Sequence, residues 1–281
     1  MNWIFKLSLM IIASYIPYSI KRKFNILRIG KRDLVQTERY VLRYLNFLSP
    51  DVKEKYLSED EGLNILEFGP GENIFLSVHA WKHNNKVFFL DDGNYINFDF
   101  EMIIDFAKLI EMPTEKLNKL ENIKNFDDLM NLTGCCFLSN GTQDLNFLKN
   151  NGYFFDLIFS TSVLEHVNKE DLQSVLDIFG EIVEQEQLHL VDFRDHITGF
   201  LDSHRIPQKI WHSFLFRKAQ FHTNRILLPE LISFFKKNST RIEIPFFDTW
   251  KDEDLKFLRH ISKKDERNFY RYAMIKVIKT S

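Results

Sequence analysis

The stretch from Leu63 to Ala80 reads LNILEFGPGENIFLSVHA, and it decides how the rest of the chain is interpreted. An apolar run ends at Phe68, and two of the chain's 10 glycines, Gly69 and Gly71, flank a proline directly after it. Glycine adopts positive φ at no steric cost and lets a ligand approach the bare backbone. We therefore predict a buried strand, a turn at which a small molecule binds and then a helix over residues 73–82. The alternative is a tight turn with no ligand.

Short apolar runs alternate with helical patterns along most of the chain. Strands are predicted at 65–68, 87–90, 135–138, 156–160 and 188–193. Helices are predicted at 35–57, 100–111, 115–131 and 169–185, the last with Asn168 as its N-cap. This alternation is typical of a parallel sheet covered by helices on both faces.

Two further strands, at 241–247 and 272–278, follow the alternating region and are separated by a polar segment. They predict an antiparallel hairpin at one sheet edge. The expected fold class is therefore α/β: a Rossmann-like doubly wound sheet, mostly parallel with an antiparallel C-terminal edge hairpin, plus N-terminal helices.

The charge is divided unevenly along the chain. Residues 1–48 carry a net charge of +7, whereas the whole chain carries −2, so the remainder carries −9. Nucleic-acid-binding proteins usually have a basic folded body, so no nucleic-acid partner is expected. The two cysteines, Cys135 and Cys136, are adjacent and lack zinc-site spacing, which fits a reducing compartment.

The N-terminus has an apolar stretch from Leu7 to Ile20, followed by three basic residues at 21–23. The stretch is shorter than the ~20 residues that span a bilayer. Three interpretations stay open: a membrane-surface or anchoring helix, a helix packed on the domain, and a cleaved signal. We divide the chain into an N-terminal helical arm (1–58) and a main domain (59–281); peripheral membrane contact through residues 1–23 is the first of these three interpretations. The expected location is cytoplasmic, at the inner face of the membrane.

Carboxylates follow the second predicted strand. In open α/β sheets, ligands bind beyond the carboxyl ends of the strands, and an acid there accepts hydrogen bonds from ribose hydroxyls. Asp91 follows Gly71 by 20 residues, the spacing expected for such an acid, with Asp92 as the alternative. A dinucleotide site needs a third glycine, which is absent, and Glu72 would repel phosphate. An adenosyl ligand without phosphate, such as S-adenosylmethionine, is favoured.

Four segments carry a family resemblance: LNILEFGPGEN, VFFLDDGNY, FDLIFSTSVLEHV and LHLVDFRDH. In this order, over about residues 60–280, they resemble the signature strands of class I S-adenosylmethionine-dependent methyltransferases. The strings GPGEN, VLEHV, VDFRDH and HTNR are together similar to a bacterial methyltransferase-domain subgroup of cell-surface glycan gene clusters. Two departures are present: EIVEQEQLHLVD replaces the usual PGG turn before the fifth strand, and Asn73 replaces the third motif glycine.

The resemblance implies roles for particular residues. Residues implied in contacts with the methionine part and ribose side of the donor are Glu67, Gly69 and Gly71. Asp91, or Asp92, would bind the ribose hydroxyls. The NGTQD stretch, with Gln143 and Asp144, would contact adenine, and Ser160, Thr161 and Ser162 would lie beside the sulfonium.

Catalysis by an oxygen methyltransferase needs a general base, and two histidines follow the predicted strands. His166 in LEHV and His196 in FRDHI are the candidates, with Asp195 or Asp192 orienting His196. A structural role is the alternative for both histidines. A metal site of His189, Asp192, Asp195 and His196 is not expected, because strand alternation puts His189 and Asp192 on opposite faces.

Residues 197–235 are interpreted as an insertion on the acceptor side. Trp211 would stack on a sugar ring, and Asn224 and Arg225 would hydrogen-bond to the acceptor. A helical subdomain with an ordinary aromatic core is the alternative.

The predicted function is S-adenosylmethionine-dependent O-methylation of a sugar or other small-molecule or glycan precursor, by in-line transfer. The alternatives are a catalytically inactive methyltransferase-like scaffold or binding protein, and another adenosyl-using transferase such as an aminopropyl transferase.

Overall fold

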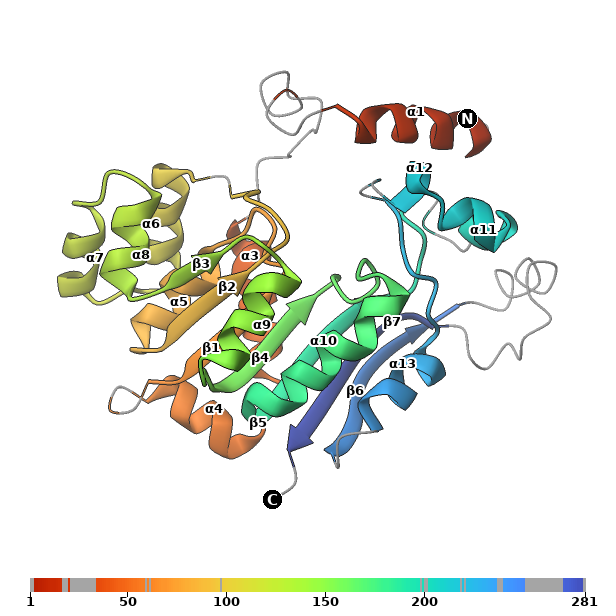
Figure 1. Cartoon of the computed structure of the whole chain (residues 1–281). Coiled ribbons are helices and arrows are strands. Elements are labelled where there is room, and N and C mark those ends of the chain that lie inside the picture. Colours follow the sequence, from red (N-terminus) through yellow and green to blue (C-terminus); the bar gives the residue numbers. More distant parts are fainter. Residues whose placement is uncertain are drawn as a thin grey trace.

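The computed structural model shows one mixed sheet with helices on both of its faces (Figure 1). The described residues are 3–16, 20, 34–58, 60, 62–96, 98–197, 199, 202–217, 219, 221–236, 240–250 and 270–279. The basic segment 21–23 lies outside them.

Seven strands form the sheet in the order β3-β2-β1-β4-β5-β7-β6 within the described residues. Their bounds are β1 Asn64–Phe68, β2 Lys86–Leu90, β3 Cys136–Leu138, β4 Phe155–Thr161, β5 Val183–Asp192, β6 Thr240–Thr249 and β7 Tyr270–Lys279. The first five strands pair in parallel, whereas β7 is antiparallel to both β5 and β6. The doubly wound sheet with its antiparallel C-terminal edge is thus confirmed, and the strand order reverses between β1 and β4, where such sheets bind ligands.

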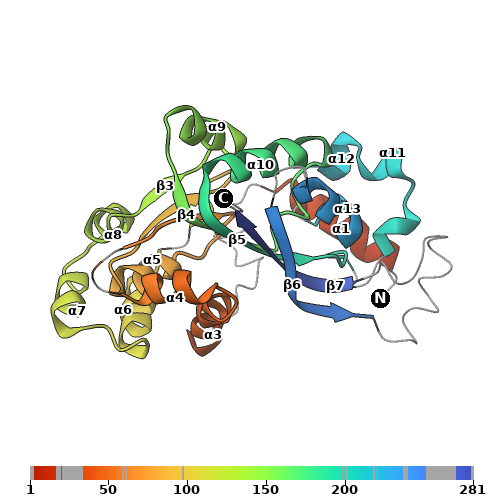
Figure 2. The same cartoon turned by 90° about the horizontal axis from the view of Figure 1, so that it is seen from below.

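Helices cover both faces of the sheet (Figures 1 and 2). On one face lie α9 (Thr142–Asn150), α10 (Lys169–Ile182) and α13 (Leu228–Phe235). The other face carries α3 (Leu34–Leu45), α4 (Pro50–Leu57), α5 (Phe75–Lys82), α6 (Phe100–Leu109), α7 (Thr114–Leu120) and α8 (Phe126–Thr133). The remaining helices lie beyond the carboxyl ends of the strands: α1 (Trp3–Ser14), the 3-10 helix η1 (Asp202–Arg205), α11 (Gln208–Trp211) and α12 (Phe214–Arg217).

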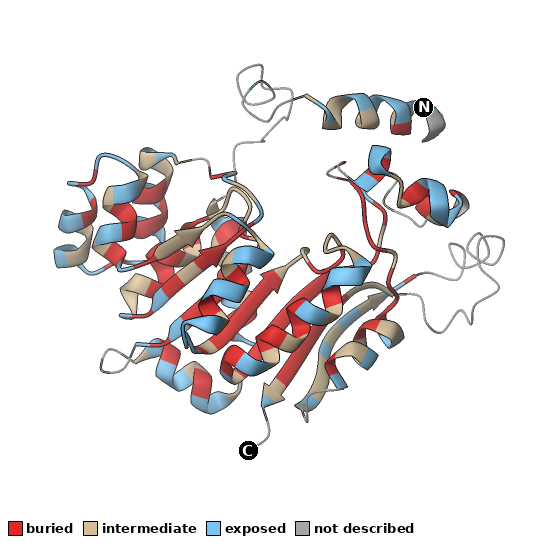
Figure 3. Ribbon diagram, in the orientation of Figure 1, coloured by how far each residue is buried: buried red, intermediate tan, exposed pale blue. Residues whose placement is uncertain are grey.

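The central strands β1, β4 and β5 are mostly buried (Figure 3), whereas β3 at the sheet edge is half-buried. Ile65 and Leu66 are neighbours in β1 that belong to opposite core clusters, and neither side chain is exposed. Each such burial contributes about 2 kcal/mol. This explains why β1 is apolar without a polar–apolar alternation.

Two predicted helices are each broken in two. The predicted helix over 35–57 is α3 and α4, and α4 begins at Pro50, whose ring suits the first turn of a helix but not its interior. The predicted helix over 115–131 is α7 and α8, because the Asn125 side chain accepts a hydrogen bond from Asp128 N and starts a new helix. Helix α9 was not predicted.

The missing PGG turn has a structural reason. Helix α10 ends at Ile182 and β5 begins at Val183, so no loop separates them and no glycine turn is needed. The predicted boundaries, 185 for the helix and 188 for the strand, are therefore both too late. Asn168 occupies the N-cap position of α10, but its side chain does not cap the helix.

The N-terminal helices pack on the rest of the molecule. Helices α3 and α4 share the main core with β1 and β4. In α1, Leu7 is buried against a cluster that includes Trp211 and Phe216, and Met10 and Ile11 pack beside it. No helix among the described residues is long and apolar enough to cross a membrane.

Candidate active site

A cleft of about 1220 Å³ lies at the carboxyl ends of β1 to β4. Seven of the individually predicted site residues line it: Gly69, Gly71, Asp91, Asp92, Gln143, Ser162 and His166. The other lining residues are Ser14, Tyr15, Phe68, Glu72, Leu90, Tyr95, Ser139, Asn140, Gly141, Thr142, Val163, Val167, Asn168, Asp171, Arg217, Ala219 and His222.

The two glycines of the turn after β1 have different surroundings. Gly69 has a φ of +73°, and a Cβ added there would lie 2.4 Å from the Val163 side chain. Gly71 has a φ of +61°, and an added Cβ would meet nothing within 4 Å. Gly69 is therefore required by local packing, whereas Gly71 faces the open space of the cleft.

Asp91 holds the turn in place. Its Oδ2 accepts a hydrogen bond from Gly71 N at 2.8 Å, and its Oδ1 accepts one from Asp92 N at 2.8 Å. Burial nevertheless raises the pKa of Asp91 to about 6, with the neighbouring Asp92 carboxylate adding to the rise. A carboxylate has about four acceptor sites, so acceptor capacity remains for a diol. The predicted meeting of the glycine turn with Asp91 is present.

Asn73, which replaces the third motif glycine, has a local role. Its Oδ1 accepts a hydrogen bond from Phe75 N, the first residue of α5, at 3.0 Å. A phosphate at a helix N-terminus uses such free N–H groups. The turn therefore presents fewer free N–H groups to a phosphate than a dinucleotide site does.

The loop after β3 forms the neighbouring wall. Gly141 N donates to Asp91 O at 2.8 Å, which ties this loop to the end of β2. Asp144 accepts from Asn140 N at 2.8 Å and closes the turn, and it does not line the cleft. Asn140 and Gln143 do line it, so the NGTQD stretch contributes by its first residues.

Glu67 and Thr161 lie on the opposite face of the sheet from the cleft wall formed by Phe68. Both line a separate small cavity of about 20 Å³ beneath α3. Glu67 Oε2 is buried and has no hydrogen-bond partner among the described residues. Burial, and then the nearby Asp91, raise the pKa of Glu67 to about 8. Thr161 Oγ1 is hydrogen-bonded to the Tyr44 hydroxyl.

Ser160 lies inside the core and not in the cleft. Its Oγ pairs with His189 Nδ1 at 2.8 Å, and the His189 ring stacks on Phe179 and Phe235 beneath α10 and α13. Ser162, two residues later, lines the cleft and has a φ of +51°, which is uncommon for a serine.

His166 lines the cleft and is held by a backbone group. Its Nδ1 lies 2.7 Å from His222 O, so Nδ1–H donates and Nε2 is left with a lone pair. Burial, and then the neighbouring His196, lower the pKa of His166 to about 4. The ring is therefore neutral at pH 7, and it is a weaker base than an ordinary histidine.

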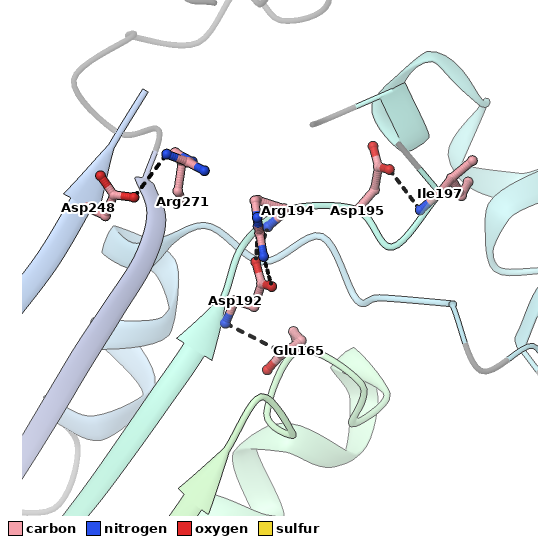
Figure 4. Close-up of polar contacts among 7 residues, drawn as sticks. All are labelled: Glu165, Asp192, Arg194, Asp195, Ile197, Asp248 and Arg271. Carbon is pink, nitrogen blue, oxygen red and sulfur yellow. Dashed lines mark hydrogen bonds and ion pairs between the residues drawn. The ribbon is translucent and has the colours of Figure 1, made fainter. Parts of the chain in front are cut away.

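His196 is exposed, with its ring centroid 4.8 Å from that of His166. The aspartates predicted to orient it make other bonds (Figure 4). Asp195 accepts from Ile197 N at 3.0 Å, and Asp192 accepts two hydrogen bonds from the Arg194 side chain, at 3.0 and 2.9 Å.

The three predicted acceptor-binding residues lie outside the cleft lining and bond internally. Trp211 has no exposed surface and donates from Nε1 to Thr223 O at 2.7 Å. The Arg225 guanidinium lies 4.2 Å from the centre of the Trp211 ring. Asn224 donates from Nδ2 to Leu164 O and Val167 O at 2.8 and 2.9 Å. Their internal bonds fit the aromatic-core alternative.

Several cleft residues were missed in the sequence analysis. Tyr15, from α1's C-terminal end, lines the cleft, and its hydroxyl donates to Leu215 O at 3.1 Å. Arg217 and His222, from the predicted acceptor-side insertion, and Asp171 also line the cleft, and we call this part of it the acceptor end. Only the packing of α1 on α12 places Tyr15 there, and no local sequence pattern indicates such a distant contact.

No protein-family model and no curated protein matches the chain. Several solved structures resemble its fold. A magnesium protoporphyrin IX methyltransferase from Synechocystis with bound SAH is 14% identical, with coverage of 93% of this chain and 94% of that chain and a TM-score of 0.46. A SAM-dependent methyltransferase from Archaeoglobus fulgidus is 12% identical, with coverage of 93% and 99% and a TM-score of 0.47. An arsenic(III) S-adenosylmethionine methyltransferase from Chlamydomonas reinhardtii is 14% identical, with coverage of 89% and 74% and a TM-score of 0.44.

Proposed function

We propose that the chain is an S-adenosylmethionine-dependent methyltransferase whose donor lies across the turn of Gly69 and Gly71. The observation that carries the proposal is the contact between Gly71 N and Asp91 Oδ2 at the cleft wall. It places a fixed carboxylate beside a backbone that has no side chain on the cleft side. A ribose diol fits the carboxylate, and adenosine fits the bare turn.

The charges in the cleft favour a donor without phosphate. Its acidic lining residues are Glu72, Asp91, Asp92 and Asp171. Arg217 also lines the cleft, but it is paired with Glu170 at 3.1 Å. An anionic pyrophosphate would be repelled here, whereas the sulfonium cation of S-adenosylmethionine would be attracted.

The cleft is large enough for two molecules. Small-molecule sites are usually about 300–1000 Å³, and this cleft is about 1220 Å³. The donor and an acceptor can therefore lie side by side. Methyl transfer is an in-line displacement, so the chain's contribution is to align the acceptor and to help remove its proton.

The acceptor in this proposal is a sugar or another small-molecule or glycan precursor, methylated on oxygen. The hydrogen-bonding group of Asn168, which lies in the cleft wall with Asp171 and Arg217, suits a hydroxylated acceptor. His166 and His196 are the imidazoles at the acceptor end, whereas Asp195 positions the loop that follows β5.

A transfer assay tests this proposal. The full chain is incubated with methyl-labelled S-adenosylmethionine and with nucleotide sugars or lipid-linked glycans, and label is followed into products that resist mild base. We expect base-stable label in a sugar-containing product, lost in Asp91→Ala and kept in the exposed control Asp127→Ala. Donor binding without transfer to any of these acceptors would contradict the glycan proposal and favour the inactive-scaffold alternative.

We propose further that α1 rests on an anionic membrane surface. Its outward side exposes Phe5, Leu9 and Ile12, at 57%, 46% and 65% of their surfaces. Phe214 of the adjacent α12 is 69% exposed. The net charge of +7 over residues 1–48 suits an anionic surface. The cleft, which Tyr15 of the same segment lines, would then open near lipid-linked acceptors.

Vesicle sedimentation tests the membrane proposal. The combined change Phe5→Ser, Leu9→Ser and Ile12→Ser should abolish binding to phosphatidylglycerol vesicles, because it removes the apolar surface and leaves the buried Leu7 in place. Phe147→Ser on α9 is the matched control, since Phe147 is also about half exposed. Equal sedimentation of both variants with the wild type would contradict the proposal.

A further inference from the structure

Three side chains with metal-ligating atoms converge beside the acceptor end of the cleft. They are Glu165, His166 and His196, and their potential ligand atoms all lie within 4.8 Å of one another. Glu165 and His166 come from the loop after β4, and His196 follows β5. These strands are neighbours in the sheet, and Asp192 N donates to Glu165 Oε1 at 3.2 Å, so the two segments are held together (Figure 4).

Glu165 has a buried oxygen that the rest of the fold does not satisfy. The side chain is 4% exposed, and its Oε2 has no hydrogen-bond partner among the described residues. Burying a carboxylate oxygen without a partner is costly, and buried charges are usually paired or bound to metals. A cation at this point would satisfy Oε2.

His166 is arranged as a metal-binding histidine usually is. Its Nδ1–H donates to the His222 carbonyl at 2.7 Å, which fixes the ring and leaves Nε2 as the free ligand atom. A backbone carbonyl bonded to the other ring nitrogen is a common second partner of metal-ligating histidines. The same bond turns His166 toward the cleft that it lines.

The third ligand can move to complete the set. His196 is exposed, and its ring is already 4.8 Å, centroid to centroid, from that of His166. Zinc–nitrogen distances of about 2.0–2.1 Å require ligand atoms somewhat closer than 4.8 Å, and an exposed side chain can shift without disturbing the core. Asp192 is engaged by Arg194 and is not counted as a ligand.

We propose that Glu165, His166 and His196 bind one divalent transition-metal ion, such as Zn²⁺, with an open coordination position toward the cleft. Two histidines and one carboxylate with an open position are the ligand set of many catalytic metal sites. The proposal differs from the expectation from sequence of no metal, which considered the cluster of His189, Asp192, Asp195 and His196.

The open position gives the ion a role that rests on the proposed function. An acceptor hydroxyl bound there loses its proton to solvent more easily, because a metal ion lowers the pKa of a bound hydroxyl. The acceptor oxygen then forms the new bond to the methyl carbon of S-adenosylmethionine. The carbon–sulfur bond breaks, and its electron pair stays on sulfur, leaving neutral S-adenosylhomocysteine.

Cobalt binding tests the site without any acceptor. The chelator-treated full chain is titrated with Co²⁺, whose visible absorption reports coordination by protein ligands, and Zn²⁺ is then added in competition. We expect one Co²⁺ per chain, displaced by Zn²⁺, and at least thirtyfold weaker binding in Glu165→Gln and in His196→Ala. The matched control is His83→Ala, at the C-terminal end of α5 and outside the cleft lining.

His196→Ala keeps the test valid if Glu165→Gln does not fold, because His196 is exposed. Absence of protein-bound cobalt absorption, or unchanged cobalt affinity in His196→Ala, would overturn the proposal. S-adenosylhomocysteine binding is measured in parallel on each variant. Loss of cobalt binding with S-adenosylhomocysteine binding kept then indicates failure of the metal site alone. Loss of S-adenosylhomocysteine binding with cobalt binding kept indicates failure of the donor site alone.

Discussion

The two ends of the cleft differ in how their residues are used. At the donor end, the contact between Gly71 and Asp91 links two turns of the backbone, and both residues line the cleft. At the acceptor end, the predicted binding residues Asn224 and Arg225 lie outside the cleft lining and bond to backbone carbonyls. Sites set by backbone conformation are therefore readable from a sequence, whereas polar side chains in an insertion can equally serve to hold it together.

The largest expected effect is on the pH dependence of the free energy of unfolding, and it comes from Glu67, beneath the donor turn. Its folded pKa of about 8 lies above the ordinary value of 4.5, because the carboxyl is buried. Between these pH values the unfolded chain has lost a proton that the folded chain keeps, so the free energy of unfolding falls as pH rises. Glu67→Gln should remove this dependence, which amounts to about 5 kcal/mol at most. Urea unfolding from pH 4.5 to pH 8 measures it.

The surface variant Glu101→Gln is the control for this series, since Glu101 is exposed in the first turn of α6. Its pH profile should match that of the wild type. If Glu67→Gln also keeps the wild-type profile, Glu67 is ionised in the free protein, and the account of the donor end is wrong on this point.

A smaller effect is expected at Asn224, at the acceptor end. Asn224→Ala removes the donor to the buried carbonyl of Leu164 and to the partly buried carbonyl of Val167. The expected loss of unfolding free energy is about 3 kcal/mol, since an unsatisfied buried polar group costs about 1–3 kcal/mol. The affinity of the variant for S-adenosylhomocysteine should stay within about twofold of the wild-type value. This is well under a tenfold change, which corresponds to ~1.4 kcal/mol.

Asn122→Ala is the matched control, because the Asn122 amide also bonds a backbone carbonyl but is exposed. It should change stability by only about 0.5 kcal/mol. Unchanged stability in Asn224→Ala, together with weaker acceptor binding, would instead make Asn224 an acceptor-binding residue.

The smallest effect separates the two possible roles of the glycine turn. Gly71 and Gly152 both have positive φ, +61° and +70°, and an added Cβ meets nothing within 4 Å at either. Gly71→Ala and Gly152→Ala should therefore each lower the free energy of unfolding by about 1 kcal/mol. Only Gly71→Ala should weaken S-adenosylhomocysteine binding, about tenfold (~1.4 kcal/mol), because only its Cβ enters the cleft. Equal affinities in the two variants would support the interpretation of a turn without ligand.

The strands of the sheet could be predicted because the sequence pattern of each strand is local. The apolar runs and the hairpin at the C-terminal edge were found within a few residues of their positions. The breaks at Pro50 and Asn125 were missed because continuous apolar periodicity concealed the capping residues. Helix α9 was missed because only Leu145 and Leu148 are buried on it.

The site was predictable only in part, for a physical reason. Gly71 and Asp91 follow directly from strand ends and spacing. The separation of Ser160 from Ser162 depends on which face of β4 each side chain takes, and Ser160 faces the α10 side. The cluster of Glu165 with His196 depends on the pairing of β4 with β5, which sequence spacing does not reveal.

Titration calorimetry with S-adenosylhomocysteine and with NAD⁺ tests the central claim most directly. The account predicts one S-adenosylhomocysteine bound per chain with a dissociation constant on the order of 1–10 μM, and no measurable heat with NAD⁺, whose pyrophosphate would meet Glu72 and Asp92. Absence of heat and of thermal stabilisation with S-adenosylhomocysteine would contradict the account, as would tighter binding of NAD⁺.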